Sequence, residues 1–350
     1  MEFLSAIDYR DPLFSIIALI FCIGIISLIA YYWDYFINKK QQDSLRHFIE
    51  SFDYMGIDKE TREFLALSQN PVPSVLFIAK MYQKSANHEK AIRLYITLLD
   101  YLKSPSEKIP ILELLGDTYY KAGFPLRAKE IFLEILHHYP RHIIILKQLI
   151  KIYEELGEYK QALEALDCLE EIQGGMEKEK AYLESKLLIT STKSQDKKLK
   201  KLLVFMETNP QLSRVILGYL KSFHPFIFWE RLEQFSPQEI LNVLDILWNI
   251  PKEEVQNKYF QSKILCDIFQ AKGYLPLSED AKSTFELESL CLLLKNNNFK
   301  GDLKFQYHCL SCQGNTPLAF ERCPYCGELL HLQIHPILKE KQNETHYSFL

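Results

Sequence analysis

Glycine is scarce in this sequence, at 12 of 350 residues. A turn-rich β protein uses glycine wherever its backbone needs a positive φ, so the scarcity favours a helix-rich protein. The formal net charge is only -4, which leaves no overall basic surface to attract nucleic acid. The composition therefore predicts a largely helical protein that does not bind nucleic acid.

Catalytic and nucleotide-binding motifs are also missing. The sequence contains no G-x-x-x-x-G-K-[ST] phosphate loop, no G-x-G-x-x-G, no H-E-x-x-H and no G-x-S-x-G. We therefore expect neither an enzyme nor a small-molecule substrate.

Cysteine carries the clearest chemical signal, because four of the eight cysteines form two C-x-x-C pairs. These four are Cys309, Cys312, Cys323 and Cys326. Two such turns supply the four thiolates of a structural Zn²⁺ site, and Fe accepts the same tetrahedron. A redox dithiol and two structural disulfides are the alternative interpretations. We predict one Zn or Fe ion in a small domain over residues 303–335, with a tail at 336–350.

The histidines near the two C-x-x-C pairs and the four other cysteines are not expected to bind the metal directly. Each histidine beside the pairs could be a ligand, but four sulfurs already complete a tetrahedral shell; these are His308, His331 and His335. The other cysteines are scattered through apolar segments and are expected to be buried; they are Cys22, Cys168, Cys266 and Cys291.

An uncharged apolar stretch near the N-terminus runs for 22 residues, from Pro12 to Trp33. About 20 such residues span a bilayer, and a cleaved signal peptide would have a shorter core after a basic segment. We therefore predict a retained membrane anchor over residues 12–36. Basic residues follow it at Lys39, Lys40 and Arg46, so the N-terminus should be periplasmic and the C-terminal body cytoplasmic.

The middle of the chain repeats with a period of 34 residues: Tyr119 matches Tyr153, and Gly123 matches Gly157. The spacing of these residues, with Ala128 and Phe132, fits the tetratricopeptide pattern of paired helices. The sequence predicts an all-α solenoid over residues 40–300. Clear repeats occupy 72–175, and degenerate ones occupy 40–71 and 176–300.

A solenoid of this kind presents a groove lined by the first helix of each repeat, which is the natural site for a protein partner. The groove candidates by repeat position are Leu76, Lys80, Gln83, Glu113, Asp117, Tyr120, Lys147, Lys151 and Glu154. Any one of them could equally be an ordinary exposed side chain.

An N-terminal anchor, cytoplasmic repeats and a C-terminal pair of cysteine knuckles form an unusual combination. The repeat motif reads Leu-Gly-Asp-x-Tyr-x-Lys-Ala-Gly over 115–123, and the cysteine spacing is C-x2-C-x10-C-P-x-C over 309–326. This combination resembles the lipopolysaccharide assembly protein B family, whose C-terminal domain is of the rubredoxin type.

The resemblance implies an adaptor in the bacterial inner membrane. It would help a membrane AAA+ protease degrade the deacetylase that commits sugar nucleotide to lipid A, and so regulate lipopolysaccharide synthesis. It also implies that the four paired cysteines are the metal ligands. The sequence leaves two alternative functions open: a membrane-tethered assembly factor for a different client, and a membrane dithiol oxidoreductase.

Overall fold

The computed structural model describes residues 23–29, 32, 71–191, 195–296 and 301–340. These ranges are mostly helical, with a small antiparallel sheet near the C-terminus. The chain divides into two compact units, Met1–Gly175 and Met176–Leu350.

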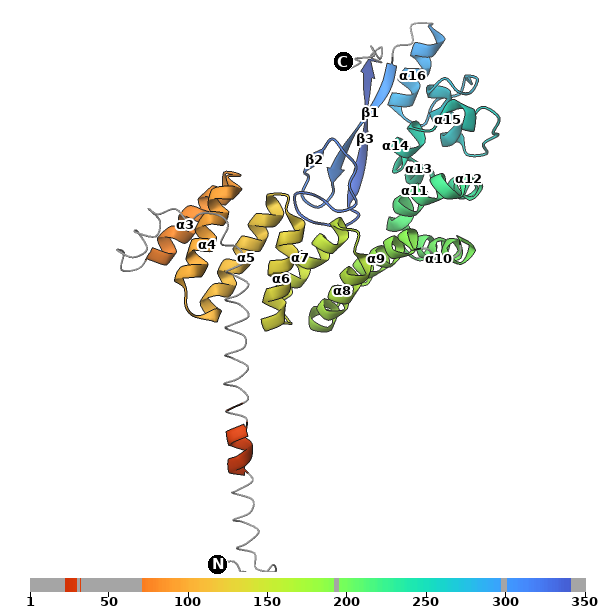
Figure 1. Ribbon diagram of the computed structural model, residues 1–350. Coiled ribbons are helices and arrows are strands. Elements are labelled where there is room, and N and C mark those ends of the chain that lie inside the picture. The colour runs from red at the N-terminus through yellow and green to blue at the C-terminus, as the bar shows by residue number, and fades with distance from the viewer. Residues whose placement is uncertain (1–22, 30–31, 33–70, 192–194, 297–300, 341–350) are drawn as a thin grey trace, which may run out of the picture. The chain divides into compact units, whose positions relative to one another are not determined.

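Six helices of similar length make up the described part of the first unit beyond residue 70. They are α3 (Pro71–Lys84), α4 (His88–Tyr101), α5 (Pro105–Lys121), α6 (Pro125–His138), α7 (Ile143–Glu155) and α8 (Tyr159–Gln173). Each helix packs against the next, and Figure 1 shows them side by side in chain order. Proline at the first position begins α3, α5 and α6, where its missing N–H costs no hydrogen bond.

The turn inside each helix pair has the same backbone geometry. The left-handed position is Ala86 (φ 58°) in the first pair, Gly123 (φ 84°) in the second and Gly157 (φ 72°) in the third. At each turn the next N–H reaches back five residues to a carbonyl oxygen, at 2.9 Å for Asn87, 2.9 Å for Phe124 and 2.8 Å for Glu158. This is the Schellman arrangement, which satisfies the last carbonyls of a helix.

Small residues allow the two helices of a pair to approach closely. A Cβ atom placed on Gly116 would lie 2.4 Å from Cε1 of Phe132, so the ring of Phe132 packs directly over this glycine. Ala128 and Phe132 are buried, as are Leu115 and Tyr119. Gly116 thus permits a close contact between α5 and α6.

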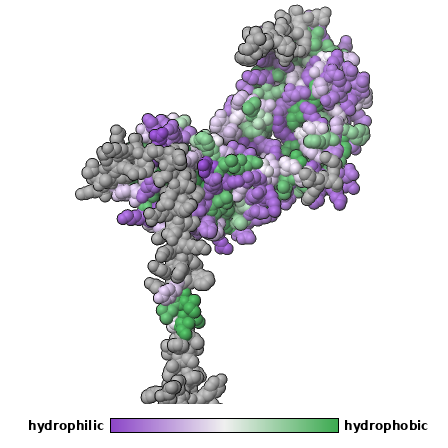
Figure 2. Space-filling model, in the orientation of Figure 1, coloured by the Kyte–Doolittle hydropathy of each residue, from purple (hydrophilic) through white to green (hydrophobic). Residues whose placement is uncertain are grey.

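The predicted membrane anchor lies mostly outside the described residues, as does the degenerate repeat predicted over 40–71, except for Pro71, which begins α3. The described part of the anchor, 23–29, is helical, and its hydrophobic side chains are exposed (Figure 2). Among the residues that the structure describes, no helix is both long and apolar enough to cross a bilayer.

The second unit begins with longer helices and continues with shorter ones. They are α9 (Glu177–Thr190), α10 (Gln195–Thr208), η1 (Pro210–Leu212), α11 (Ser213–Phe223), α12 (Pro225–Glu233), α13 (Pro237–Leu241), α14 (Leu244–Trp248), η2 (Lys252–Glu254), α15 (Lys263–Ala271) and α16 (Phe285–Lys295). An aromatic cluster supports the short helices: Trp229 lies 5.4 Å from Phe260 and 5.9 Å from Phe269, between ring centroids. Helices of 5 to 9 residues over 225–271 differ from the 13- to 17-residue helices of the first unit.

The sheet has the strand order β2-β1-β3. Strands β1 (Gly301–Cys309) and β3 (Leu332–Glu340) pair over their full length, from Gly301↔Glu340 to Cys309↔Leu332, and β2 (Asn315–Thr316) pairs with the end of β1. The sequence placed the start of a tail at residue 336, whereas residues 336–340 belong to β3. Their pairing with β1 satisfies backbone groups that a tail would leave to water.

Candidate metal centre

The four paired cysteines lie on two turns with matching backbone geometry. The residue after each pair has a positive φ, 59° for Gln313 and 75° for Gly327. Its N–H donates to the carbonyl oxygen of the first cysteine of the pair, Cys309 or Cys323, at 2.9 Å in both turns. Each turn therefore curls its two thiols toward one point.

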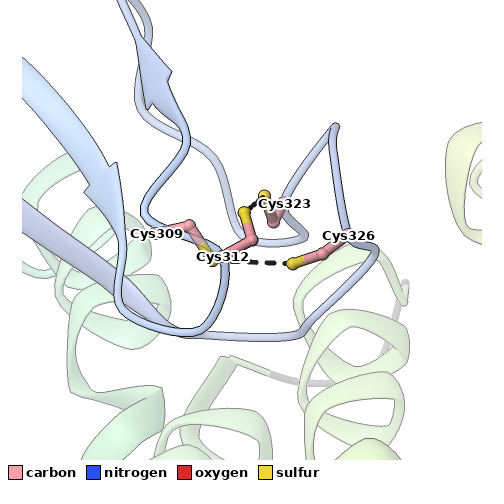
Figure 3. A group of neighbouring side chains, drawn as sticks. All are labelled: Cys309, Cys312, Cys323 and Cys326. Carbon is pink, nitrogen blue, oxygen red and sulfur yellow. Dashed lines mark hydrogen bonds between the residues drawn. The ribbon is translucent and has the colours of Figure 1, made fainter.

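The two turns bring all four sulfur atoms together, within 4.8 Å of one another (Figure 3). The Sγ atoms of Cys309 and Cys326 are 3.6 Å apart, and those of Cys312 and Cys323 are 3.7 Å apart. A disulfide needs about 2.05 Å. Zn–S bonds of about 2.3 Å at tetrahedral angles separate the sulfurs by about 3.8 Å. The observed spacing therefore fits a four-sulfur metal site, and all four cysteines are free in this structure.

The ionisation of these thiols points the same way. Burial opposes the Cys309 thiolate, but N–H groups of Cys312 and Ser311 and the neighbouring thiols lower its pKa to about 7. The N–H of Glu328 favours the Cys326 thiolate, yet burial and the three other cysteines raise the pKa of Cys326 to about 12. Four thiolates this close would need a cation between them, a role that Zn²⁺ or Fe would fill.

A tightly packed glycine shapes the loop between the two turns. A Cβ on Gly314 would lie 2.5 Å from Cδ2 of Tyr325 and 3.2 Å from the sulfur of Cys312. The hydroxyl of Tyr325 donates to the carbonyl oxygen of Asn315 at 3.1 Å. The Tyr325 ring thus packs directly over Gly314, which has no side chain to displace it.

Acidic residues beside the second turn attach the centre to α9. The hydroxyl of Tyr182 donates to Glu321 at 2.7 Å, and Nζ of Lys186 lies 2.8 Å from the same carboxylate. Lys178 and Glu328 form a longer ion pair at 3.6 Å. The metal-binding turns therefore pack on a helix of the second unit.

Strand β1 is held by hydrogen bonds to the helices along its length, from Asp302 near its start to Tyr307 near its end. The hydroxyl of Tyr307 donates to Asp245 at 3.0 Å, and Arg214 donates to both oxygens of that carboxylate, at 2.8 and 2.5 Å. Nε1 of Trp248 donates to Asp302 at 2.8 Å. Sequence reasoning missed these supporting residues, because their partners are tens of residues away and no local pattern marks them.

The nearby histidines make other contacts. The rings of His308 and His335 pack edge to face at 4.4 Å, and Nδ1 of His331 lies 2.6 Å from the hydroxyl of Ser311. In the described ranges, the four cysteines are the one group of His, Cys, Asp and Glu side chains with metal-ligand spacing. Cys168 is exposed rather than buried, so that expectation was wrong, whereas Cys291 is buried as expected.

The groove candidates all lie on the first helices α3, α5 and α7. Nε2 of Gln83 donates to Asp117 at 2.8 Å, which joins α3 to α5. His142, just before α7, lies 2.7 Å from Glu113 on α5. Polar contacts thus tie Gln83, Asp117 and Glu113 to neighbouring helix pairs. Lys80 and Lys147 are exposed.

No known family model and no curated protein matches this chain in sequence.

Proposed function

We propose that this protein is a membrane-anchored tetratricopeptide-repeat adaptor. Its repeats bind a client protein, and its anchor over residues 12–36 holds that complex at the bacterial inner membrane. The client that the resemblance favours is the lipid A deacetylase, presented to a membrane AAA+ protease. The protein would thereby regulate lipopolysaccharide synthesis without catalysing a reaction itself.

The observation that carries this proposal is the recurrence of one helix pair in the first unit. Three pairs share the same turn, with Ala86, Gly123 and Gly157 at the left-handed position. The contact of Phe132 with Gly116 is the kind of close helix packing that the tetratricopeptide pattern requires. One helix pair cannot bury its own apolar face, so stacked pairs favour a solenoid.

The surface of the first helices favours a protein or peptide partner. Gln83 contacts Asp117, and Glu113 contacts His142; these two contacts between neighbouring helix pairs hold the surface in one arrangement. A surface that is ordered before binding loses less conformational entropy when a partner docks. Exposed lysines on α3 and α7 remain available to a client.

The exposed apolar helix over 23–29 supports the anchor. Basic residues after the span favour a cytoplasmic body, where thiols stay reduced and able to bind metal. Anchoring raises the effective concentration of the repeats near membrane-bound partners without adding a contact.

A depletion experiment tests this function. Depleting the protein from its bacterium should lengthen the half-life of the deacetylase and raise lipopolysaccharide content. Cells complemented with the Lys80→Glu, Lys147→Glu double variant should behave like depleted cells, because two exposed positive charges of the groove are reversed. Lys103→Glu is the matched control, since Lys103 is exposed in the connection between α4 and α5.

An unchanged deacetylase half-life after depletion would remove this client. A groove variant that still impairs growth would then favour an assembly factor for another client, which uses the same surface.

A further inference from the structure

The four cysteines of the metal centre differ sharply in exposure. Cys309 and Cys323, which begin the two turns, are 0% and 2% exposed. Cys312 and Cys326, the second cysteines of the two turns, are exposed. The centre therefore has two sulfurs that a small solute reaches and two that it does not.

Each exposed sulfur lies beside a buried sulfur of the opposite turn. Cys326 is 3.6 Å from Cys309, and Cys312 is 3.7 Å from Cys323 (Figure 3). Closing either pair to a disulfide of about 2.05 Å requires a movement of under about 2 Å. The fold thus places an exposed cysteine beside a buried one in two pairs: Cys326 beside Cys309, and Cys312 beside Cys323.

We propose that this centre is a site of oxidative modification by peroxide-class oxidants. A bound metal would hold these thiols deprotonated. The exposed thiolate of Cys326 or Cys312 then attacks H₂O₂, which breaks the O–O bond and gives a sulfenic acid and hydroxide. The buried thiolate opposite attacks that sulfur, forms the disulfide and expels a second hydroxide. In total the two thiolates lose two electrons, and H₂O₂ takes up two protons and becomes two water molecules. A bound metal would lose two of its four sulfur ligands.

Oxidation also alters how the centre is attached. Glu321 and Glu328 flank the second turn and hold it on α9 through Tyr182, Lys186 and Lys178. Metal binding supplies much of the folding free energy of so small a domain, so its loss loosens these contacts. This inference concerns the metal centre and does not depend on the adaptor function.

Proteolysis can distinguish this disulfide pattern from the usual one within C-x-x-C. The zinc-loaded full chain, solubilised in detergent, is treated with one equivalent of H₂O₂, alkylated and digested with trypsin. Trypsin cleaves after Lys304, Arg322 and Lys339, which places the two turns on separate peptides, 305–322 and 323–339. We expect the two peptides to be joined by a disulfide, with one equivalent of zinc released to a metal-sensitive dye.

Separate peptides, each with an internal disulfide, would overturn the proposal, as would full zinc retention at tenfold excess peroxide. A reduced protein that contains no zinc would also overturn it. Cys168→Ser is the matched control: Cys168 is exposed but lies on α8, outside the cluster, so the variant should release zinc at the wild-type rate. Hydrogen exchange of residues 310–330 should rise on oxidation and fall again after reductant and zinc are added.

Discussion

Tyr307→Phe is the sharpest test of how the sheet is attached to the helices. Tyr307 is buried, and its hydroxyl donates to Asp245, which is also held by Arg214. Removing a hydrogen bond to a charged group costs about 1.5–3 kcal/mol. We therefore expect the free energy of unfolding of the second unit to fall by that amount at pH 7.5.

The pH dependence provides an independent check. Burial, followed by the charge of Asp245 and its hydrogen bond, raises the pKa of Tyr307 to about 12. An unfolded tyrosine has a pKa near 10, so the protonated hydroxyl contributes stability that is complete below about pH 10 and is lost as pH rises toward about 12. The phenylalanine variant has no such group. The stability gap between wild type and Tyr307→Phe should therefore narrow above about pH 10.

Tryptophan fluorescence during urea unfolding can measure the free energy of unfolding of the second unit alone. The chain has 3 tryptophans, Trp33, Trp229 and Trp248, so a Trp33→Phe background leaves two probes, both in the second unit. Tyr259→Phe is the control, because Tyr259 is 90% exposed, and it should change stability by under about 0.5 kcal/mol. If Tyr307→Phe costs no more than this control, the buried network does not hold the sheet.

Three further changes have defined outcomes. Ala86→Gly should stabilise α3 and α4 by roughly 1 kcal/mol and slow their hydrogen exchange, because alanine is strained at a φ of 58°. Gly123→Ala should destabilise α5 and α6 and speed their hydrogen exchange. A stability change of the same sign in both variants would refute the strain argument. Cys309→Ser should release the metal, measured by metal analysis, and speed hydrogen exchange over residues 301–340. Cys266→Ser should do neither. Metal affinity should fall by about tenfold or more per pH unit on acidification, since protons compete for the thiolates; a pH-independent affinity would exclude cysteine ligands.

The cysteine turns and the helix pairs are features that local sequence is able to predict. A C-x-x-C spacing determines which way two thiols face, since a four-residue turn has few conformations, and two such turns bring four sulfurs to one point. A 34-residue period likewise places Gly116 against Phe132, because both lie within one short helix pair. Ala86 could not be predicted in this way, because alanine, unlike the glycines at 123 and 157, does not indicate a left-handed turn.

The attachment of the metal centre was decided by tertiary structure alone. Glu321 meets Tyr182 across 139 residues of chain, and Tyr307 meets Asp245 across 62. Nothing near either residue encodes such a partner, because the contact depends on how whole helices pack and not on any repeating pattern. Cys309 and Cys323 are buried, whereas Cys312 and Cys326 are exposed, and their matching C-x-x-C positions do not predict this difference. Four identical side chains at matching positions in sequence thereby acquire two different chemical environments, because burial is a property of the folded chain.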